Sequence, residues 1–404
     1  MERIYYFMAE KKYGGLKAVE PDYEQLKKDI KKHRMKILKY AGEVLLLVVL
    51  VLVVVTLLYA LRTYDSYEVK STIKRENTSL AEYEMFQDYI LEYSNDGVRC
   101  VAQNGELVWN QAFEMAKPMV KTAGDYLVVY DQGGTTVYIL KEEGLQKKIE
   151  TAIPIQTVCL AEQGTVAVLM KEDGESQVKL FDRKGKELAN GKFYDNKGSY
   201  PIDIALSSDA QKLAVCMINV IGGRVGSTIS FYNFGSVGQT EIDNNVGTYN
   251  YDGMLFPEIE YVSSTKMIAL GTDKVLIFEG SQKPEVAEEI VIEDVVLSYF
   301  YNNKYIGMVY DNPELENSKH IKVMDMKGKV VMENDTELSY DRVTFLSNDE
   351  ICLMNQAECE LFTIHGIKKF SYTFDKQLCK IIAGNGAQEY TFIFQETTEE
   401  VQLK

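Results

Sequence analysis

Histidine and cysteine, the side chains that most often supply nucleophiles, general bases and zinc ligands, are sparse in this sequence. The chain has 404 residues but only three histidines, and a long apolar segment separates His33 from His320 and His365. No two of the six cysteines are adjacent. A His-based triad or a three-histidine zinc site needs several such residues together. The sequence therefore predicts no metal and no cofactor, and His365 before Gly366 has the pattern of a hairpin turn.

Cysteine spacing leaves one possible covalent link. Four cysteines fall inside apolar runs, which predicts buried free thiols; they are Cys100, Cys159, Cys216 and Cys379. Cys352 and Cys359 flank Asn355-Gln356, and a two-residue turn there would set them opposite each other on neighbouring strands. At a non-hydrogen-bonded pair they would be close enough for a disulfide, and otherwise they remain free thiols.

Carboxylates are the most numerous side-chain groups that could act as general acids or bases, with 60 Asp and Glu residues against 44 Lys and Arg. Two suitably spaced carboxylates suffice for glycoside hydrolysis, but no pattern selects a pair. No glycine-rich phosphate loop follows a strand and opens a helix, so nucleotide binding has no support. The net charge of −16 argues against nucleic acid, which is bound through basic patches. The sequence therefore favours a protein that is not an enzyme, with a hydrolase or sensor carrying an unrecognised carboxylate site as the alternative.

The elements that would position any such site are short strands. From Tyr67 onward, runs rich in Val, Ile, Tyr and Phe are broken by Gly, Asn and Asp, a pattern typical of antiparallel sheets. One strand-and-turn unit recurs, most clearly as VKLFDRKGK at 178 and IKVMDMKGK at 321. Its strands start at 98, 137, 178, 229, 275, 321, 361 and 401. Repeats of about 40 to 50 residues with four short strands indicate propeller blades. We expect an all-β, eight-bladed β-propeller, with seven blades as the alternative.

The two ends of this repeat region predict how the ring closes. The eighth unit reaches its third strand as the sequence ends at Lys404, while an unassigned strand, Tyr67 to Lys74, precedes the first unit. If that strand completes the last blade, two sheet edges are covered at once.

The segment NDGVRCVAQNGELVW, from Asn95 to Trp109, carries a family resemblance. It resembles one repeat of the quinoprotein-like (PQQ-type) propellers, and two or three other blades resemble that repeat weakly. Trp109 is the only tryptophan, so Phe, Tyr and Met must take the packing role that the family gives to repeated tryptophans. With its basic tail and its YEVKSTIKRENTS entry, the whole chain resembles uncharacterised membrane-anchored propeller proteins of clostridia-type bacteria, whose function is unassigned.

A hydrophobic run before the strands predicts the membrane anchor. Residues 44–61 contain 15 Leu or Val and no charge, and such a run is close to the length of helix that crosses a bilayer. Seven basic residues precede it: Lys27, Lys28, Lys31, Lys32, Arg34, Lys36 and Lys39. By the positive-inside rule the N-terminus is cytoplasmic. We expect a basic tail over 1–36, a transmembrane helix over 37–62 and an extracytoplasmic propeller over 63–404 in the cell membrane.

Long segments between the predicted strands are candidate binding loops, at 219–227, 244–257 and 311–318. The second holds the apolar candidates for a partner-binding loop: Tyr249, Tyr251, Leu255 and Phe256. Exposed aromatic side chains often carry the energy of an interface. The sequence thus predicts a binding or scaffolding module for an envelope protein or a cell-wall ligand.

Overall fold

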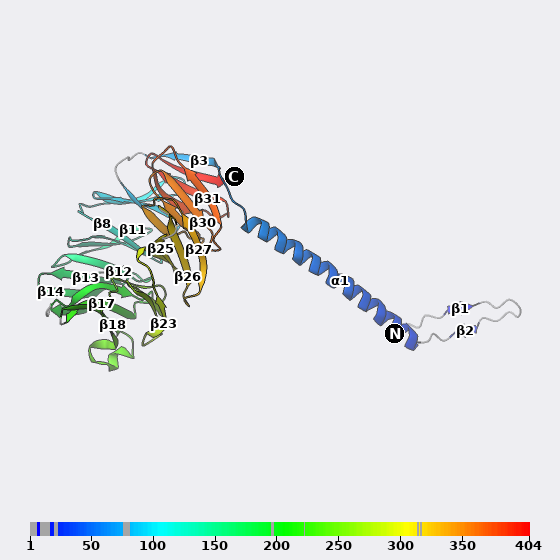
Figure 1. The fold of residues 1–404 in the computed structure, drawn as a ribbon, viewed down its shortest axis with the longest axis horizontal. Helices are drawn as coiled ribbons and strands as arrows, with labels where there is room; N and C mark the ends of the chain where they lie inside the picture. The colour runs from blue at the N-terminus through cyan, green and yellow to red at the C-terminus, as the bar shows by residue number, and fades with distance from the viewer. Residues whose placement is uncertain are drawn as a thin grey trace. The chain divides into compact units, whose positions relative to one another are not determined.

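The computed structural model describes residues 6–8, 17–19, 23–75, 81–194, 198–221, 223–312, 315 and 317–404. These residues form two compact units, Met1–Arg62 and Thr63–Lys404 (Figure 1). Residue 222 of the segment 219–227, and residues 313, 314 and 316 of the segment 311–318, lie outside the described residues.

The first unit is dominated by one long helix, α1 (Tyr23–Ala60). It follows a short antiparallel pair, β1 (Tyr6–Met8) and β2 (Lys17–Val19). The helix joins the basic segment to the apolar run, and its side chains from Val44 to Val54 are exposed around its whole circumference. In the described part of the chain, α1 is the one helix long and apolar enough to cross a membrane. A helix that is apolar on all sides needs lipid or protein around it.

The second unit is an eight-bladed β-propeller, because its described residues form eight four-stranded antiparallel sheets in chain order (Figure 1). The first strands are β4 (Glu82–Phe86), β8 (Pro118–Ala123), β12 (Ile155–Leu160), β16 (Tyr200–Leu206), β20 (Glu258–Tyr261), β24 (Val296–Tyr301), β28 (Arg342–Phe345) and β32 (Leu378–Ala383). The second strands are β5 (Tyr89–Ser94), β9 (Tyr126–Asp131), β13 (Val166–Glu172), β17 (Lys212–Ile221), β21 (Lys266–Leu270), β25 (Tyr305–Asp311), β29 (Ile351–Met354) and β33 (Glu389–Phe394).

The third strands are β6 (Gly97–Ala102), β10 (Thr136–Lys141), β14 (Glu175–Phe181), β18 (Arg224–Asn233), β22 (Lys274–Glu279), β26 (Lys319–Asp325), β30 (Glu358–Phe362) and β34 (Thr397–Leu403). The fourth strands are β7 (Leu107–Ala112), β11 (Gly144–Glu150), β15 (Glu187–Tyr194), β19 (Asn245–Asp252), β23 (Glu285–Val291), β27 (Val330–Thr336), β31 (Lys368–Thr373) and β3 (Tyr67–Lys74). All eight strand starts predicted from the repeat fall in third strands, which confirms eight blades and excludes seven.

The predicted ring closure is confirmed. Strand β3 pairs antiparallel with β34, from Tyr67 opposite Leu403 to Lys74 opposite Thr397, and completes blade 8 (Figure 1). The Tyr67 ring packs edge-on against Phe392, with ring centroids 5.2 Å apart. The first and last strands of the propeller therefore share one sheet, and the last strand has a neighbour on each side.

The core lies between blades, so no blade buries its apolar faces alone. Leu127, Val129 and Leu140 of blade 2, for example, pack in one buried cluster with Leu91 and Val98 of blade 1. This nearest-neighbour packing explains why second and third strands read as almost continuous apolar runs: both of their faces contact another blade.

The repeated DxKGK sequence forms the turn between the third and fourth strands. In blade 3, the carboxylate of Asp182 accepts the backbone N–H groups of Lys184 and Lys186 at 2.8 and 2.9 Å. Gly185 follows with φ of 77°, a conformation that favours glycine. Asp325 makes the same pair of hydrogen bonds in blade 6. The repeat therefore encodes a hairpin turn.

Candidate functional site

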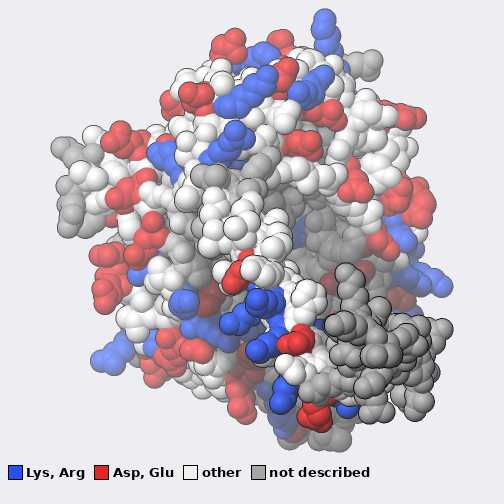
Figure 2. Space-filling view, turned by 90° about the vertical axis from the view of Figure 1, so that its right-hand side faces the viewer, with Lys and Arg blue, Asp and Glu red and all other residues white. Residues whose placement is uncertain are grey.

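The axis of the propeller is lined by the first strands, since first strands of neighbouring blades contact one another around most of the ring. These strands hold five acidic and three basic residues: Glu82 and Glu84 on β4, Lys121 on β8, Asp203 on β16, Glu258 and Glu260 on β20, Arg342 on β28 and Lys380 on β32. Elsewhere the charges are mixed, and on the face seen in Figure 2 acidic and basic side chains are interspersed. Eight charged residues thus lie on the strands that line the ring axis.

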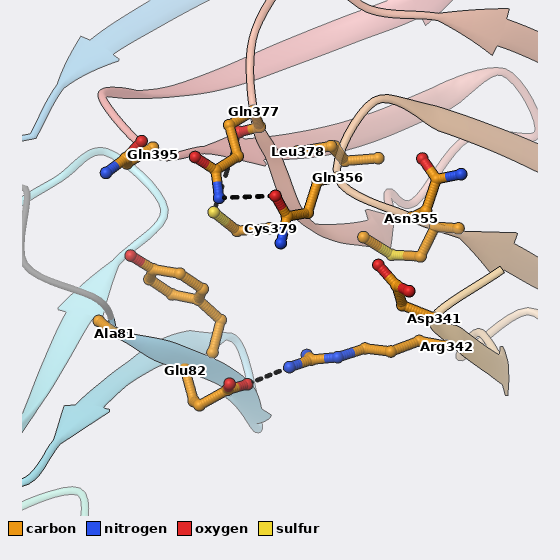
Figure 3. A pocket seen from close by; sticks show the side chains of 12 residues that line it. Ala81, Glu82, Asp341, Arg342, Asn355, Gln356, Gln377, Leu378, Cys379 and Gln395 are labelled. Atoms are coloured by element: carbon orange, nitrogen blue, oxygen red, sulfur yellow. Dashed lines mark hydrogen bonds and ion pairs between the residues drawn. The ribbon is translucent and has the colours of Figure 1, made fainter.

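A polar pocket lies where blades 7, 8 and 1 meet (Figure 3). We call it the blade 7-8-1 pocket; it has a volume of about 260 Å³. Glu82 of blade 1 and Arg342 of blade 7 form an ion pair across it, and both side chains are about half exposed. The amides of Gln356 and Gln377 meet at 3.4 Å on its other side. Donors and acceptors from three blades therefore converge on one opening.

A second cavity of about 450 Å³, here called the channel pocket, reaches across the ring. Its lining comes from blades 1, 2, 5 and 6 and includes Glu84, Lys121, Glu260, Tyr261 and Tyr301. Because blades 2 and 5 are not neighbours, residues that both contribute to this cavity must face each other near the axis.

Three contacts connect charges around the axis. The Lys121 ammonium lies 3.8 Å from the Glu260 carboxylate. Lys380 donates to Glu84 at 2.8 Å and joins blades 8 and 1. The third contact is the Glu82–Arg342 pair of the blade 7-8-1 pocket. Charged side chains thus link blades through the centre of the ring, in addition to the apolar contacts between neighbours.

Two further carboxylates are held by neutral donors. The Tyr301 hydroxyl donates to Glu258 at 2.7 Å, and the backbone N–H of Ile259 donates to Asp203 at 2.8 Å. Neither carboxylate forms an ion pair with any residue that the structure describes. The axis therefore carries more negative than positive charge.

The restricted solvent around the axis changes how these groups titrate. Burial raises the pKa of Asp203 to about 7, with nearby Glu260 adding to the rise while the Ile259 N–H and Lys121 oppose it. Burial also raises the pKa of Glu260, against the attraction of Lys121. The Glu260 carboxylate in turn raises the pKa of Lys121. The two carboxyl shifts have the direction expected where burial disfavours the charged form of an acid.

Asp203 makes the stability of the propeller depend on pH. Its pKa is near 7 in the folded protein and ordinary, about 3.9, in the unfolded chain, so the folded state binds the extra proton between these values. This contribution to stability is complete below pH 4 and is lost as the pH rises through 7. We expect Asp203→Asn to reduce the fall in melting temperature between pH 5 and pH 8. The control is Glu150→Gln on an exposed outer strand, where the pKa is lowered. Equal pH dependence in Asp203→Asn and the wild type would contradict this assignment.

The prediction that the aromatic residues of segment 244–257 lie on an exposed loop is wrong. Tyr249 and Tyr251 belong to β19, the outer strand of blade 4, and Phe256 is completely buried. The Tyr249 hydroxyl donates to the Pro284 carbonyl at 2.9 Å, while the Tyr251 ring packs on Phe256 at 5.1 Å. Leu255 is half-buried beside them. The segment 244–257 is aromatic because it fills the interface between blades 4 and 5, which the sequence pattern does not distinguish from an exposed loop.

The turn that would have set Cys352 opposite Cys359 does not form. The Asn355 side chain accepts the N–H groups of Ala357 and Glu358, so the turn is Gln356-Ala357, one residue later than expected. Cys352 is then opposite Leu361, and Cys359 is opposite Met354. Both cysteines are free thiols.

Burial raises the pKa of all six cysteine thiols. Cys100, Cys159, Cys216, Cys352 and Cys359 are buried and Cys379 is half-buried, all as free thiols. Burial raises the pKa of Cys352 to about 12. A thiol with such a pKa has little of the nucleophilic thiolate form at neutral pH.

The axial charges were missed by the sequence reasoning, although a signal for them exists. Lys121, Asp203 and Lys380 each interrupt an otherwise apolar or neutral first strand, in blades 2, 4 and 8. A charged residue recurring at the innermost position of several blades points to the ring axis.

Several solved structures are similar to this chain. One is BamB from Moraxella catarrhalis, with 11% identity, a TM-score of 0.48 and coverage of 84% of this chain and 100% of that one. Another is a eukaryotic initiation factor, with 14% identity, a TM-score of 0.49 and coverage of 81% of this chain and 83% of that one. The Pan2 WD40 domain of Neurospora crassa gives 8% identity, a TM-score of 0.45 and coverage of 85% and 97%.

A search of curated protein sequences finds no match. A family model does match, over residues 60–403, which includes every strand of the propeller. This agrees with the expected membership in an uncharacterised propeller family. The chain belongs to the family of unknown function DUF5711.

Proposed function

We propose that this protein is a binding or scaffolding module of the bacterial cell envelope, tethered by α1, which holds an envelope protein or a cell-wall ligand and does not turn over a substrate. The observation that carries the proposal is the blade 7-8-1 pocket, where an exposed ion pair and amide groups from three blades converge on a closed ring. A rigid ring holds such groups in place without the ordering cost that a flexible loop has on binding.

The proposed topology has the N-terminus in the cytoplasm and the propeller outside. Its support is the charge asymmetry around the apolar run: seven Lys and Arg residues lie between 27 and 39, whereas Arg62 and then Lys70 follow it. Positive charge is retained on the cytoplasmic side during insertion. Residues 61–66 connect α1 to β3.

A second candidate function, an envelope hydrolase, rests on Asp203 and Glu260. Burial raises the pKa of both carboxyl groups, which is a property of general acids. We rank it second because the two residues come from neighbouring first strands and contribute to the same side of the axis. A hydrolase needs its two carboxyl groups on opposite sides of the scissile bond.

One experiment tests binding and topology together. Intact cells producing the full chain are treated with a membrane-impermeant amine cross-linker, and modified lysines and captured partners are identified by mass spectrometry. We expect modified lysines only after residue 63, and a partner whose capture falls in Glu82→Gln/Arg342→Met. The matched control is Lys148→Met/Glu150→Gln, which removes an equally exposed ion pair from the outer strand of blade 2.

Three outcomes would count against the proposal. Modification of Lys27 to Lys39 in intact cells would reverse the topology. Equal capture by the wild type and the Glu82/Arg342 double variant would mean that the blade 7-8-1 pocket does not bind the partner. Degradation of a wall glycan by the purified protein would favour the hydrolase.

A further inference from the structure

We infer that the N-terminal part of α1, residues 23–41, is a dimerisation segment that forms a parallel, two-stranded coiled coil with α1 of a second copy of this chain. The inference goes beyond the proposed function, because it concerns neither the propeller nor its ligand. From the proposed function it takes one element, the crossing of the bilayer by α1, which makes the helices of two copies parallel.

The first step is the length of α1. The helix has 38 residues and contains no proline. At about 1.5 Å per residue it extends about 57 Å, whereas the hydrocarbon core of a bilayer is roughly 30 Å thick. The uncharged apolar run begins only at Val44. The continuous helix therefore carries residues 23–41 beyond the lipid tails, and their apolar side chains face water in a single copy.

The second step is the spacing of residues along this segment. Alternating intervals of three and four residues place side chains in one stripe along a helix, the a and d positions of a heptad repeat. In residues 23–41 these positions hold Tyr23, Leu26, Ile30, His33, Ile37 and Tyr40. None of the seven basic residues between 27 and 39 lies among them. The five apolar or aromatic members are 48–67% exposed in the single chain, so the stripe is available to a second helix.

The third step is the kind of residue at each position. From residue 23 to residue 51, four of the five a positions hold a β-branched residue: Ile30, Ile37, Val44 and Val51. Leu26 and Leu47 occupy d positions. β-branched residues at a and leucine at d favour two strands over three or four. The register also continues from the basic segment into the apolar run without an insertion, so one seam serves both parts of α1.

The fourth step is the charge beside the stripe. Asp29 lies at a g position and Arg34 at the e position five residues later. In a parallel coiled coil, a g residue of one helix faces the following e residue of the other. Asp29 of each copy therefore faces Arg34 of the other copy, and the opposite-charge pair forms twice. This complementarity selects a second copy of the same helix as the occupant of the stripe.

The test measures the mass of the full-length protein in neutral detergent by analytical ultracentrifugation over a range of concentrations. We expect the wild type to be a dimer. Ile30→Lys/Ile37→Lys should raise the dissociation constant about tenfold or more, because it places four charges in the seam. The matched control, Met35→Lys/Leu38→Lys, adds the same charge at the f and b positions outside the seam. It should change the dissociation constant by less than about threefold.

His33→Leu gives the opposite sign and decides the case even if the lysine double variant inserts poorly. Leucine at this d position should tighten the dimer, because it replaces a polar side chain in the seam. Oxidative cross-linking in isolated membranes supplies an independent readout. Ile30→Cys and Ile37→Cys should each give a disulfide-linked dimer, whereas Lys28→Cys, at an f position, should not. The wild type with its six native cysteines gives the background.

A monomeric or trimeric wild type, a weaker dimer in His33→Leu, or an equal loss in the Met35/Leu38 control would overturn the inference. A monomer in which the bilayer protects Ile30→Cys from a water-soluble maleimide would place the stripe on lipid, and would overturn it too. The proposed function fails separately, because partner capture is tested through Glu82 and Arg342, which lie outside α1. A dimer without a captured partner upholds the inference alone, and a captured partner on a monomer upholds the proposed function alone.

Discussion

Deletion of residues 65–76 from the full-length chain is expected to abolish cooperative folding of the propeller. The deletion removes β3 and thereby the whole ladder between β3 and β34. It also removes Tyr67, whose ring contacts Phe370, Tyr372, Phe374 and Phe392. Loss of a whole strand ladder together with these aromatic contacts is large beside the roughly 5–15 kcal/mol that stabilises most domains.

The measurement is limited proteolysis combined with thermal unfolding followed by near-UV circular dichroism. Deletion of residues 1–22 is the control, since it shortens the chain while leaving α1 and every strand of the propeller in place. If the 65–76 deletion melts at the wild-type temperature, β3 does not close the ring.

Glu350→Gln is expected to destabilise the propeller by about 3–5 kcal/mol, because it leaves a buried lysine without its counter-charge. Lys369 donates to Glu350 at 2.5 Å and to the Tyr390 hydroxyl at 2.7 Å, and the Tyr390 hydroxyl also donates to Glu350. All three residues are less than a tenth exposed. Glu350 and Lys369 belong to blade 7 and Tyr390 to blade 8, so the network fixes one blade against the next.

A double-mutant cycle separates this charge effect from loss of packing. Glu350→Gln/Lys369→Met should be more stable than the sum of its single variants indicates, since neither charge is left buried alone. Trp109, the only tryptophan, reports urea unfolding by its fluorescence. The exposed pair Lys148 and Glu150 provides the comparison, and Glu150→Gln should change stability by less than about 0.5 kcal/mol. Strictly additive free energies would mean that Lys369 and Glu350 do not depend on each other.

The repeat was readable from sequence because the third strand and its turn carry a chemical signature. Asp182 and Gly185 are needed for one kind of hairpin, and the same types recur at Asp325 and Gly328. Counting these units gave eight blades, and the unassigned strand before them gave the closure. The spacing of the recurring third strands was thus sufficient for the number of blades.

The errors arose where local patterns have more than one structural outcome. A turn at Asn355-Gln356 and a turn at Gln356-Ala357 are equally compatible with the flanking strands, and only the Asn355 side-chain hydrogen bonds select the second. Tyr251 and Phe256 had the composition of an interface, which proved to be the interface between two blades of the same chain. The axial site was missed because Lys121 and Glu260 come together only when blades 2 and 5 face each other across the closed ring.

The sharing of blade 8 between β3 and β34 also sets the order of events during synthesis. Tyr67 pairs with Leu403, so β3 is made long before its partner exists. At translation rates of about 5 to 20 residues per second, this interval lasts roughly 20 to 70 s. Throughout that time blades 1 to 7 can stack in order, yet the ring remains open at its first and last edges. The nascent chain therefore keeps these two sheet edges unpaired until residues 397–403 have joined the sheet.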